Sequence, residues 1–183
     1  MMRIENTDGR YGAVAVVLHW LMAILVIVLA GLGLYMAGLP DVGFDTKKIK
    51  LILYHKEFGL LALTLVVVRL GWRLANKIPQ LVAHLPDWQK IGARFVHLSF
   101  YALMFALPIT GWLMSSAAGI PVSFFGLFAL PDFVPHDDYM FQRLIEIHKW
   151  LAYGLILFIF VHVGAALRHH FMFRDDTLSR MLS

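Results

Sequence analysis

The 183-residue chain contains no cysteine and few charged side chains. The absence of cysteine excludes disulfides, cysteine-ligated iron–sulfur clusters and covalent haem attachment through a Cys-x-x-Cys-His motif. Any metal centre must therefore use histidine, methionine or carboxylate ligands. Charged residues make up only 15% of the chain, hydrophobic residues make up 60%, and the mean hydropathy is +0.70. This composition indicates a polytopic membrane protein, and the modest basic excess, 16 against 12, does not call for a nucleic-acid partner.

Four apolar segments are long enough to cross a bilayer as helices. They cover residues 11–37, 51–74, 95–118 and 144–171. The connection 119–143 is long and partly apolar, but its prolines argue against a fifth span, so we expect an interfacial periplasmic segment or a short amphipathic piece there. The sequence therefore predicts one all-α transmembrane domain over residues 1–183, a four-helix bundle.

The distribution of lysine and arginine predicts the orientation of this bundle. Ten basic residues lie on the side of the two termini and six on the opposite side. Because cytoplasmic loops carry an excess of Lys and Arg, we expect both termini in the cytoplasm.

A stripe of histidines on the last span is the strongest chemical signal. His148, His162 and His169 lie in a segment whose middle, 150–167, has no charged side chain. The first two are separated by 14 residues, about four helical turns, so both rings leave the same face about 21 Å apart. Ionisable groups inside a bilayer are costly and usually functional. The stripe predicts two bound centres, one near each membrane surface.

Depth in the membrane sorts the histidines into two sets. His55 and His148 lie at the outer level, whereas His19 and His162 lie at the inner level, with His97 as a further inner candidate. Two neutral imidazoles from facing helices complete a six-coordinate haem iron without covalent attachment. A single transmembrane histidine can instead bond a neighbouring helix. Two depth-matched pairs favour haem.

The same 14-residue step identifies candidates opposite each ligand. From His19 and His97 it reaches Gly33 and Gly111, both at the outer level, where a missing side chain lets a porphyrin approach the backbone. Ordinary small-residue helix packing is the alternative for each glycine. From His55 on the second span, the same step reaches Arg69, which could pair with an inner haem propionate or extend to lipid headgroups.

Several short motifs, taken in order and with their spacing, carry a resemblance to a known family. They are Leu18-His19-Trp20, Leu53-Tyr54-His55-Lys56, Val67-Val68-Arg69-Leu70, His97-Leu98, Ala106-Leu107-Pro108-Ile109-Thr110-Gly111, His148-Lys149-Trp150, His162, Arg168-His169-His170-Phe171, and Asp175-Asp176-Thr177-Leu178 with Arg180-Met181. Over nearly its whole length the chain resembles the bacterial cytochrome b561 family, the four-helix di-haem cytochromes.

The resemblance implies a specific ligand set and location. It implies two non-covalent b-type haems, with His19 and His162 at the inner haem and His55 and His148 at the outer haem. This agrees with the depth argument. It also implies a multi-pass protein of the bacterial inner membrane.

Three histidines remain without iron in this assignment. His169 lies seven residues after the inner ligand His162, on the same face and at the cytoplasmic boundary. A titratable histidine there could carry the proton that accompanies quinone chemistry, and the resemblance implies ubiquinone as the partner. His170 shares this candidate role, with an interfacial cationic pair as the alternative for both. His97 could contact quinone or bond a haem propionate.

Four lysines cluster at the outer start of the second span. They are Lys47, Lys48, Lys50 and Lys56. They could steer a small anion toward the outer haem, or contact lipid headgroups. Because six basic residues on this side face seven acidic ones, any positive field must be local to the cluster.

The resemblance implies an oxidoreductase. The family includes superoxide oxidases, which take electrons from periplasmic superoxide and reduce ubiquinone. A cytochrome b subunit that serves a periplasmic redox partner, such as a hydrogenase or formate dehydrogenase, is the alternative. A transporter that uses its histidines for zinc or protons is an alternative of another class.

Overall fold

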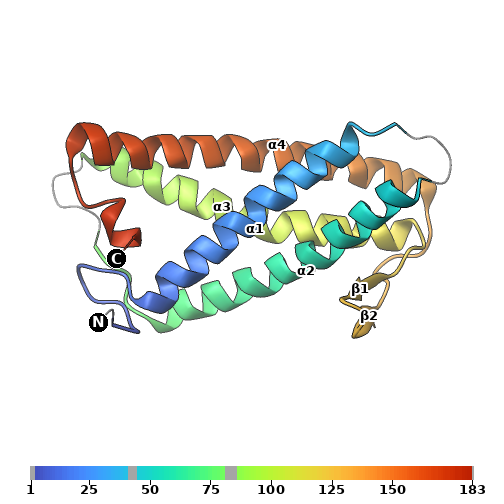
Figure 1. The fold of residues 1–183 in the computed structure, drawn as a ribbon, viewed down its shortest axis with the longest axis horizontal. Helices are drawn as coiled ribbons and strands as arrows, with labels where there is room; N and C mark the ends of the chain where they lie inside the picture. The colour runs from blue at the N-terminus through green and yellow to red at the C-terminus, as the bar shows by residue number, and fades with distance from the viewer. Residues whose placement is uncertain (1–2, 41–44, 81–85, 183) are drawn as a thin grey trace.

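The computed structural model describes residues 3–40, 45–80 and 86–182. Four long helices form an elongated bundle: α1 (Ala13–Ala37), α2 (Thr46–Ala75), α3 (Asp87–Ala117) and α4 (Asp138–Arg168). Both ends of the chain lie at one end of the bundle, which we call the terminal end (Figure 1). A small β-hairpin lies at the opposite end, which we call the hairpin end.

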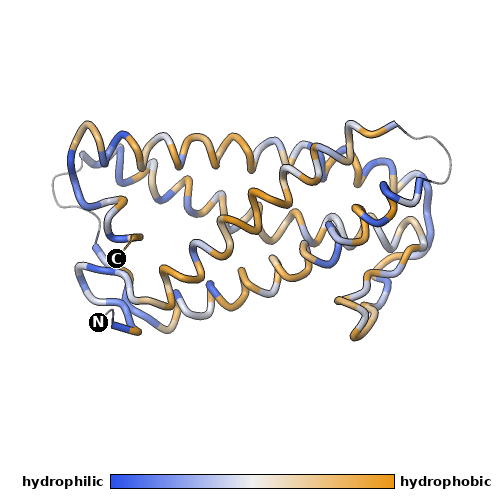
Figure 2. The backbone as a smooth tube through the Cα atoms, viewed as in Figure 1, coloured by the Kyte–Doolittle hydropathy of each residue, from blue (hydrophilic) through white to orange (hydrophobic). Residues whose placement is uncertain are grey.

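All four helices are long and apolar enough to cross a membrane. The predicted all-α, four-helix membrane fold is therefore confirmed. Each expected span lies mostly within one helix, but α2, α3 and α4 begin well before the apolar segments do. The Asp45 and Asp137 side chains cap α2 and α4 by accepting hydrogen bonds from backbone N–H groups of the first turn. Hydropathy cannot detect such polar first turns, which appear as the blue helix ends in Figure 2.

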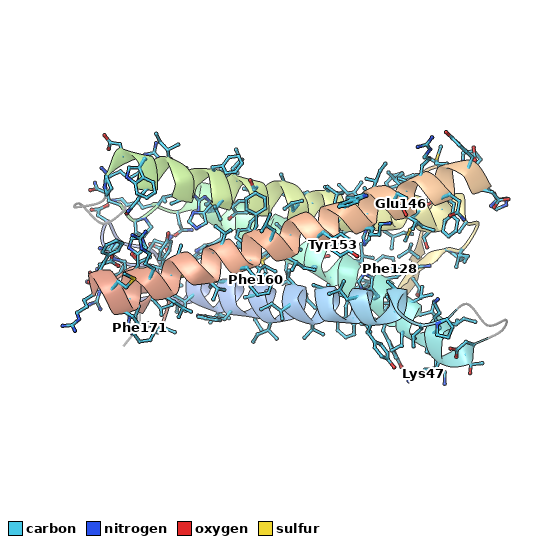
Figure 3. The ribbon with its side chains drawn as sticks, turned by 90° about the horizontal axis from the view of Figure 1, so that it is seen from above. Lys47, Phe128, Glu146, Tyr153, Phe160 and Phe171 are labelled. Atoms are coloured by element: carbon cyan, nitrogen blue, oxygen red, sulfur yellow. The ribbon has the colours of Figure 1, made fainter. Side chains whose placement is uncertain are left out.

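Two opposite faces of α4 explain how the bundle is organised. Tyr153 and Phe160 lie seven residues apart on the outward face (Figure 3), and Phe160 is 72% exposed. Such a face suits contact with lipid. The stripe of His148, Leu155 and His162 has the same spacing, and Leu155 is only 5% exposed. The histidine stripe is therefore the inward face of α4.

Helix packing is uneven around the bundle. Close backbone packing joins α1 to α2, α2 to α3 and, most extensively, α3 to α4. Within the described part of the chain, α4 makes no comparable packing with α1 or α2. Side chains, rather than closely packed backbones, therefore connect α4 to these two helices.

The connection 119–143, expected to be an interfacial segment or a short amphipathic piece, contains a short β-hairpin. Strand β1 (Val122–Phe124) pairs antiparallel with β2 (Phe128–Leu130). Phe125 and Gly126 both adopt positive φ, +50° and +72°, as the two central residues of a type I′ turn do. This turn suits the right-handed twist of paired strands, which favours a hairpin over a helix at this point.

At the terminal end the N-terminal segment folds tightly onto α1. The Gly12 N–H donates to the Asn6 side chain (2.8 Å), and the Asn6 amide donates to the Lys77 carbonyl (2.8 Å). A Cβ atom at Gly12 would collide with the Ile4 carbonyl oxygen. Gly12 therefore allows the N-terminal segment to pass directly over the start of α1.

We expect Gly12→Ala to loosen the N-terminal segment, at a cost of about 1–3 kcal/mol for the forced shift. Amide hydrogen exchange should accelerate over residues 3–12 while the middle of each helix is unchanged. Gly9→Ala is the matched control because nothing lies within 4 Å of its added Cβ. Equal exchange in the two variants would contradict this account.

Candidate functional site

One pair of histidines faces across the bundle at the hairpin end. The rings of His55 on α2 and His148 on α4 have centroids 6.2 Å apart and an interplanar angle of 74°. Cβ atoms added at Gly33 and Gly111 would lie 3.4 Å and 3.5 Å from the Cε1 atoms of these two rings. Both predicted glycines thus lie beside the predicted outer histidines, where a larger residue would press on the rings.

The two histidines of this pair have different hydrogen-bonding partners. His148 Nδ1 lies 3.0 Å from Thr110 Oγ1, and Thr110 Oγ1 lies 2.9 Å from the Leu107 carbonyl. His55 Nδ1 is buried and has no hydrogen-bond partner among the described residues. Sequence reasoning assigned no role to Thr110, although it directly precedes Gly111 in a motif that carried the family resemblance.

A cluster of three imidazoles lies nearer the terminal end. The rings of His19 on α1 and His162 on α4 have centroids 6.2 Å apart, with an interplanar angle of 63°. The His97 ring on α3 lies 5.7 Å from the same His162 ring. Arg69 contacts this cluster through its guanidinium, 3.2 Å from His19 Nδ1. The residues predicted at the inner level are therefore brought together.

A small cavity of about 30 Å³ lies next to Arg69 at the terminal end. Trp72, Arg73 and Tyr101 also line it, and the Arg73 guanidinium lies 5.8 Å from the centre of the Tyr101 ring. Trp72 Nε1 is buried and has no hydrogen-bond partner among the described residues. Guanidinium and indole N–H groups only donate hydrogen bonds, so this lining suits an acceptor or an anion. Sequence reasoning did not bring Trp72 and Arg73 into a site.

The structure separates the roles of His169 and His170. The helix of α4 continues as a π-helical turn, η1 (His169–Phe173). His169 Nδ1 lies 2.6 Å from Asp175 Oδ2, and both side chains are largely buried. His170 is exposed, with its ring against Phe171. Only His169 is therefore held in a defined polar contact.

The segment after η1 folds back across the terminal end. It contains the short 3₁₀ turn η2 (Ser179–Met181). Trp20 Nε1 donates to the Met181 carbonyl (2.6 Å), and the Arg180 guanidinium donates to the Gln80 carbonyl (2.8 Å). The contact between His169 and Asp175 forms the bend that allows these two hydrogen bonds. This contact therefore anchors the C-terminal segment to the bundle.

The four lysines lie in the first part of α2, and three of them are already engaged. Lys47 Nζ donates to the Tyr35 hydroxyl (2.9 Å). Lys48 and Lys56 donate to backbone carbonyls of neighbouring segments (3.1 Å each). Lys50 is exposed. Lys50 therefore has the greatest freedom to meet a diffusing anion.

The environment of Asp175 makes the C-terminal anchor sensitive to acid. Burial raises the pKa of this carboxyl, but hydrogen bonds from Thr177 and His169 outweigh burial and leave the pKa below its ordinary value. A carboxylate with a depressed pKa contributes stability above the ordinary Asp value of about 3.9. That contribution is lost as the pH falls through the lower pKa of the folded protein.

We expect Asp175→Asn to release the C-terminal segment at neutral pH, because the two carboxylate oxygens accept separately from His169 and from the Thr177 N–H, whereas an amide has one acceptor oxygen and no charge. Hydrogen exchange over residues 174–182 should accelerate. Asp176→Asn is the control, because the Asp176 carboxyl is 70% exposed and lies 3.6 Å from the Arg180 guanidinium. If both variants exchange at the same rate as the parent, the anchor assignment is wrong.

Comparisons with known proteins cover almost the whole chain. A family model described as prokaryotic cytochrome b561 matches residues 10–183. The chain is 36% identical over 181 residues to cytochrome b561 homolog 2 of Escherichia coli (strain K12), covering 99% of this chain and 95% of that protein. It is 29% identical over 178 residues to the probable superoxide oxidase CybB of Yersinia pestis, covering 94% of this chain and 96% of that protein.

Proposed function

Because this chain belongs to the prokaryotic cytochrome b561 family, we propose that it carries electrons between two b-type haems across the bacterial inner membrane. It is a multi-pass bacterial membrane protein with four helices that can span the bilayer. The proposal assigns the terminal end to the cytoplasm and the hairpin end to the periplasm. Haem b supplies one-electron iron chemistry when bound.

The separation of the histidine rings is the observation that carries this proposal. Metal–imidazole bonds are about 2.0 Å long, and a ring nitrogen lies about 1.1 Å from its ring centre, so two imidazoles that share one iron would have ring centres about 6.2 Å apart. The His55–His148 and His19–His162 pairs both have centroids 6.2 Å apart. Both pairs are therefore spaced as two histidine ligands of one haem iron would be.

The chemistry of the donor set supports haem over a bare metal ion. Although three imidazoles lie close together at the terminal end, no three His, Asp or Glu side chains among the described residues are placed to hold a metal ion by themselves. Haem iron needs only two protein ligands because the porphyrin supplies four. Gly33 and Gly111 leave free the space beside the hairpin-end rings that a larger side chain would fill.

The terminal-end cluster offers two possible partners for His162, and we assign His19. Its ring separation of 6.2 Å matches axial coordination, whereas His97 lies closer, at 5.7 Å. His97 then serves as a propionate or quinone contact. The Arg69 and Arg73 guanidinium groups at the small cavity suit the carboxylates of haem propionates.

We expect His19→Ala and His162→Ala each to lose one of two haems, and His97→Ala to retain both, because only the first two ligate iron. Haem content and the split b-type α-bands of the purified protein measure this. His136→Ala is the surface control. Retention of both haems in His162→Ala, or loss of one in His97→Ala, would refute the ligand assignment. A parent protein without b-type bands would refute the cytochrome proposal and favour a histidine-using ion transporter.

We assign superoxide as the electron donor and ubiquinone as the acceptor. The name of the Yersinia pestis relative, a probable superoxide oxidase, supports this donor. In the balanced reaction two superoxide ions each lose one electron and become O₂. Ubiquinone gains these two electrons and two protons and becomes ubiquinol. This chain must therefore admit an anion at one end and supply protons at the other.

The proton-supplying residues belong at the terminal end in this proposal. Asp175 accepts the proton on His169 Nδ1, which leaves Nε2 as the nitrogen that can exchange a proton with quinone. The exposed His170 connects this site to the aqueous phase. His97, whose ring lies beside that of the proposed ligand His162, is the third candidate residue for contact with quinone.

An exposed apolar hairpin supports the alternative of a docked periplasmic partner. Leu127 at its tip is 76% exposed, and Phe128 is exposed beside it. A cytochrome b subunit for a hydrogenase or formate dehydrogenase would use such a surface and would react slowly alone. Stopped-flow mixing of the isolated protein with superoxide and a ubiquinone analogue distinguishes the two. Rapid haem reduction followed by quinol formation supports the oxidase, and no reaction supports the subunit.

We expect Lys50→Gln to slow the bimolecular reaction with superoxide and to weaken its dependence on ionic strength, because it removes the freest positive charge at the hairpin end. Rates at several salt concentrations measure the effect. Lys77→Gln is the matched control, since Lys77 lies at the terminal end, 3.4 Å from Asp8. An equal loss of rate in both variants would exclude steering by Lys50.

A further inference from the structure

The threonine beside Gly111 has no role in the proposed function so far. It lies in the motif Ala106–Gly111 of α3, two residues after Pro108, the proline inside this helix. Its hydroxyl oxygen lies between a backbone carbonyl of its own helix and the His148 ring of α4. Thr110 therefore connects a helix that carries no assigned ligand to a histidine assigned to iron.

The hydrogen-bond roles at Thr110 follow from the chemistry of the three groups. A carbonyl only accepts, so the single hydroxyl hydrogen of Thr110 is donated to the Leu107 carbonyl at 2.9 Å. The hydroxyl oxygen then accepts from His148, whose Nδ1 lies 3.0 Å away, and the Leu107 carbonyl is a second acceptor close to the same ring. His148 is therefore protonated on Nδ1, and the lone pair needed for iron is on Nε2.

Two of the other paired histidines, His19 and His55, have no such partner among the described residues. His19 Nδ1 faces the Arg69 guanidinium, which can only donate, so His19 would offer Nε2 to iron only when Arg69 donates to another acceptor such as a haem propionate. His55 Nδ1 is buried without a hydrogen-bond partner among the described residues. A neutral acceptor that defines the protonated nitrogen is therefore seen at His148.

We propose that Thr110 is a positioning residue for the hairpin-end haem: it holds His148 with Nε2 toward the iron and lowers the reduction potential of that haem. A hydrogen bond donated by the outer nitrogen of a ligating imidazole fixes the ring and strengthens its bond to the metal. Stronger donation stabilises the oxidised iron. This inference rests on the proposed function, because it requires haem between His55 and His148.

The consequence is a bias on electron flow. By holding His148, Thr110 would favour electron transfer from the hairpin end toward the terminal end. Loss of the hydroxyl would favour retention of the electron at the hairpin end. Thr110 thus helps set the direction of transfer without touching donor or acceptor.

Thr110→Val tests this, because valine keeps the shape of threonine and removes the hydroxyl. We expect both haems to remain bound. In a redox titration, the equilibrium of one of the two haems should shift about threefold to tenfold toward the reduced form, which is the typical effect of one hydrogen bond. The low-spin electron paramagnetic resonance signal of that same haem should change. Thr110→Ser should restore both properties.

Thr64→Val is the matched control. Thr64 Oγ1 donates to the Leu60 carbonyl (3.0 Å) on the exposed face of α2, so this variant removes the same kind of helical hydrogen bond at a site that faces away from the haem ligands. Should Thr110→Val lose haem, Thr110→Ala carries the same test with a smaller side chain.

Four outcomes would overturn the proposal: unchanged potentials in Thr110→Val, failure of Thr110→Ser to restore them, an equal shift in Thr64→Val, or loss of a haem in both Thr110→Val and Thr110→Ala. A parent protein without two b-type haems would instead refute the proposed function, and the haem content of the parent separates the two failures.

Discussion

The need to satisfy imidazoles inside an apolar bundle is the constraint on which this structure depends. A polar ring on a membrane helix is costly unless a neighbouring helix meets it. The inward stripe of α4 places its rings at two levels: α2 meets one level, α1 meets the other, and α3 contacts both. His148 faces His55 and bonds Thr110, while His162 faces His19. The histidines therefore link α4 to helices with which its backbone does not pack closely.

The two ends of the bundle are chemically different, and this difference favours a directional function. The hydrogen-bond partner seen at the hairpin-end pair is neutral, the Thr110 hydroxyl beside His148. The terminal-end cluster is basic, with Arg69 and Arg73 beside a small cavity. Cationic neighbours favour the reduced form of a nearby redox centre, whereas strong imidazole donation favours the oxidised form. Both effects favour electron movement toward the terminal end.

The terminal end is also where the chain closes on itself. The N-terminal segment and the C-terminal segment both contact the region around residues 77–80. The contact of His169 with Asp175 forms the bend of the C-terminal segment. A single polar pair thus holds a structural segment in place and is also the proposed site of proton exchange, so loosening one role would disturb the other.

The sequence alone determined the class of the protein, its four-helix membrane fold and its family, because hydropathy, composition and motif spacing are properties of the chain. The spacing of His148 and His162 also predicted that they share one face. The sequence did not predict which side chains of neighbouring helices contact each other. Whether His19 or His97 approaches His162, and which group accepts the proton of His148, depends on how helices rotate and pack against each other. Helix rotation is set by many small packing interactions, so only the tertiary structure decided that Thr110, Asp175 and Trp72 belong to the sites.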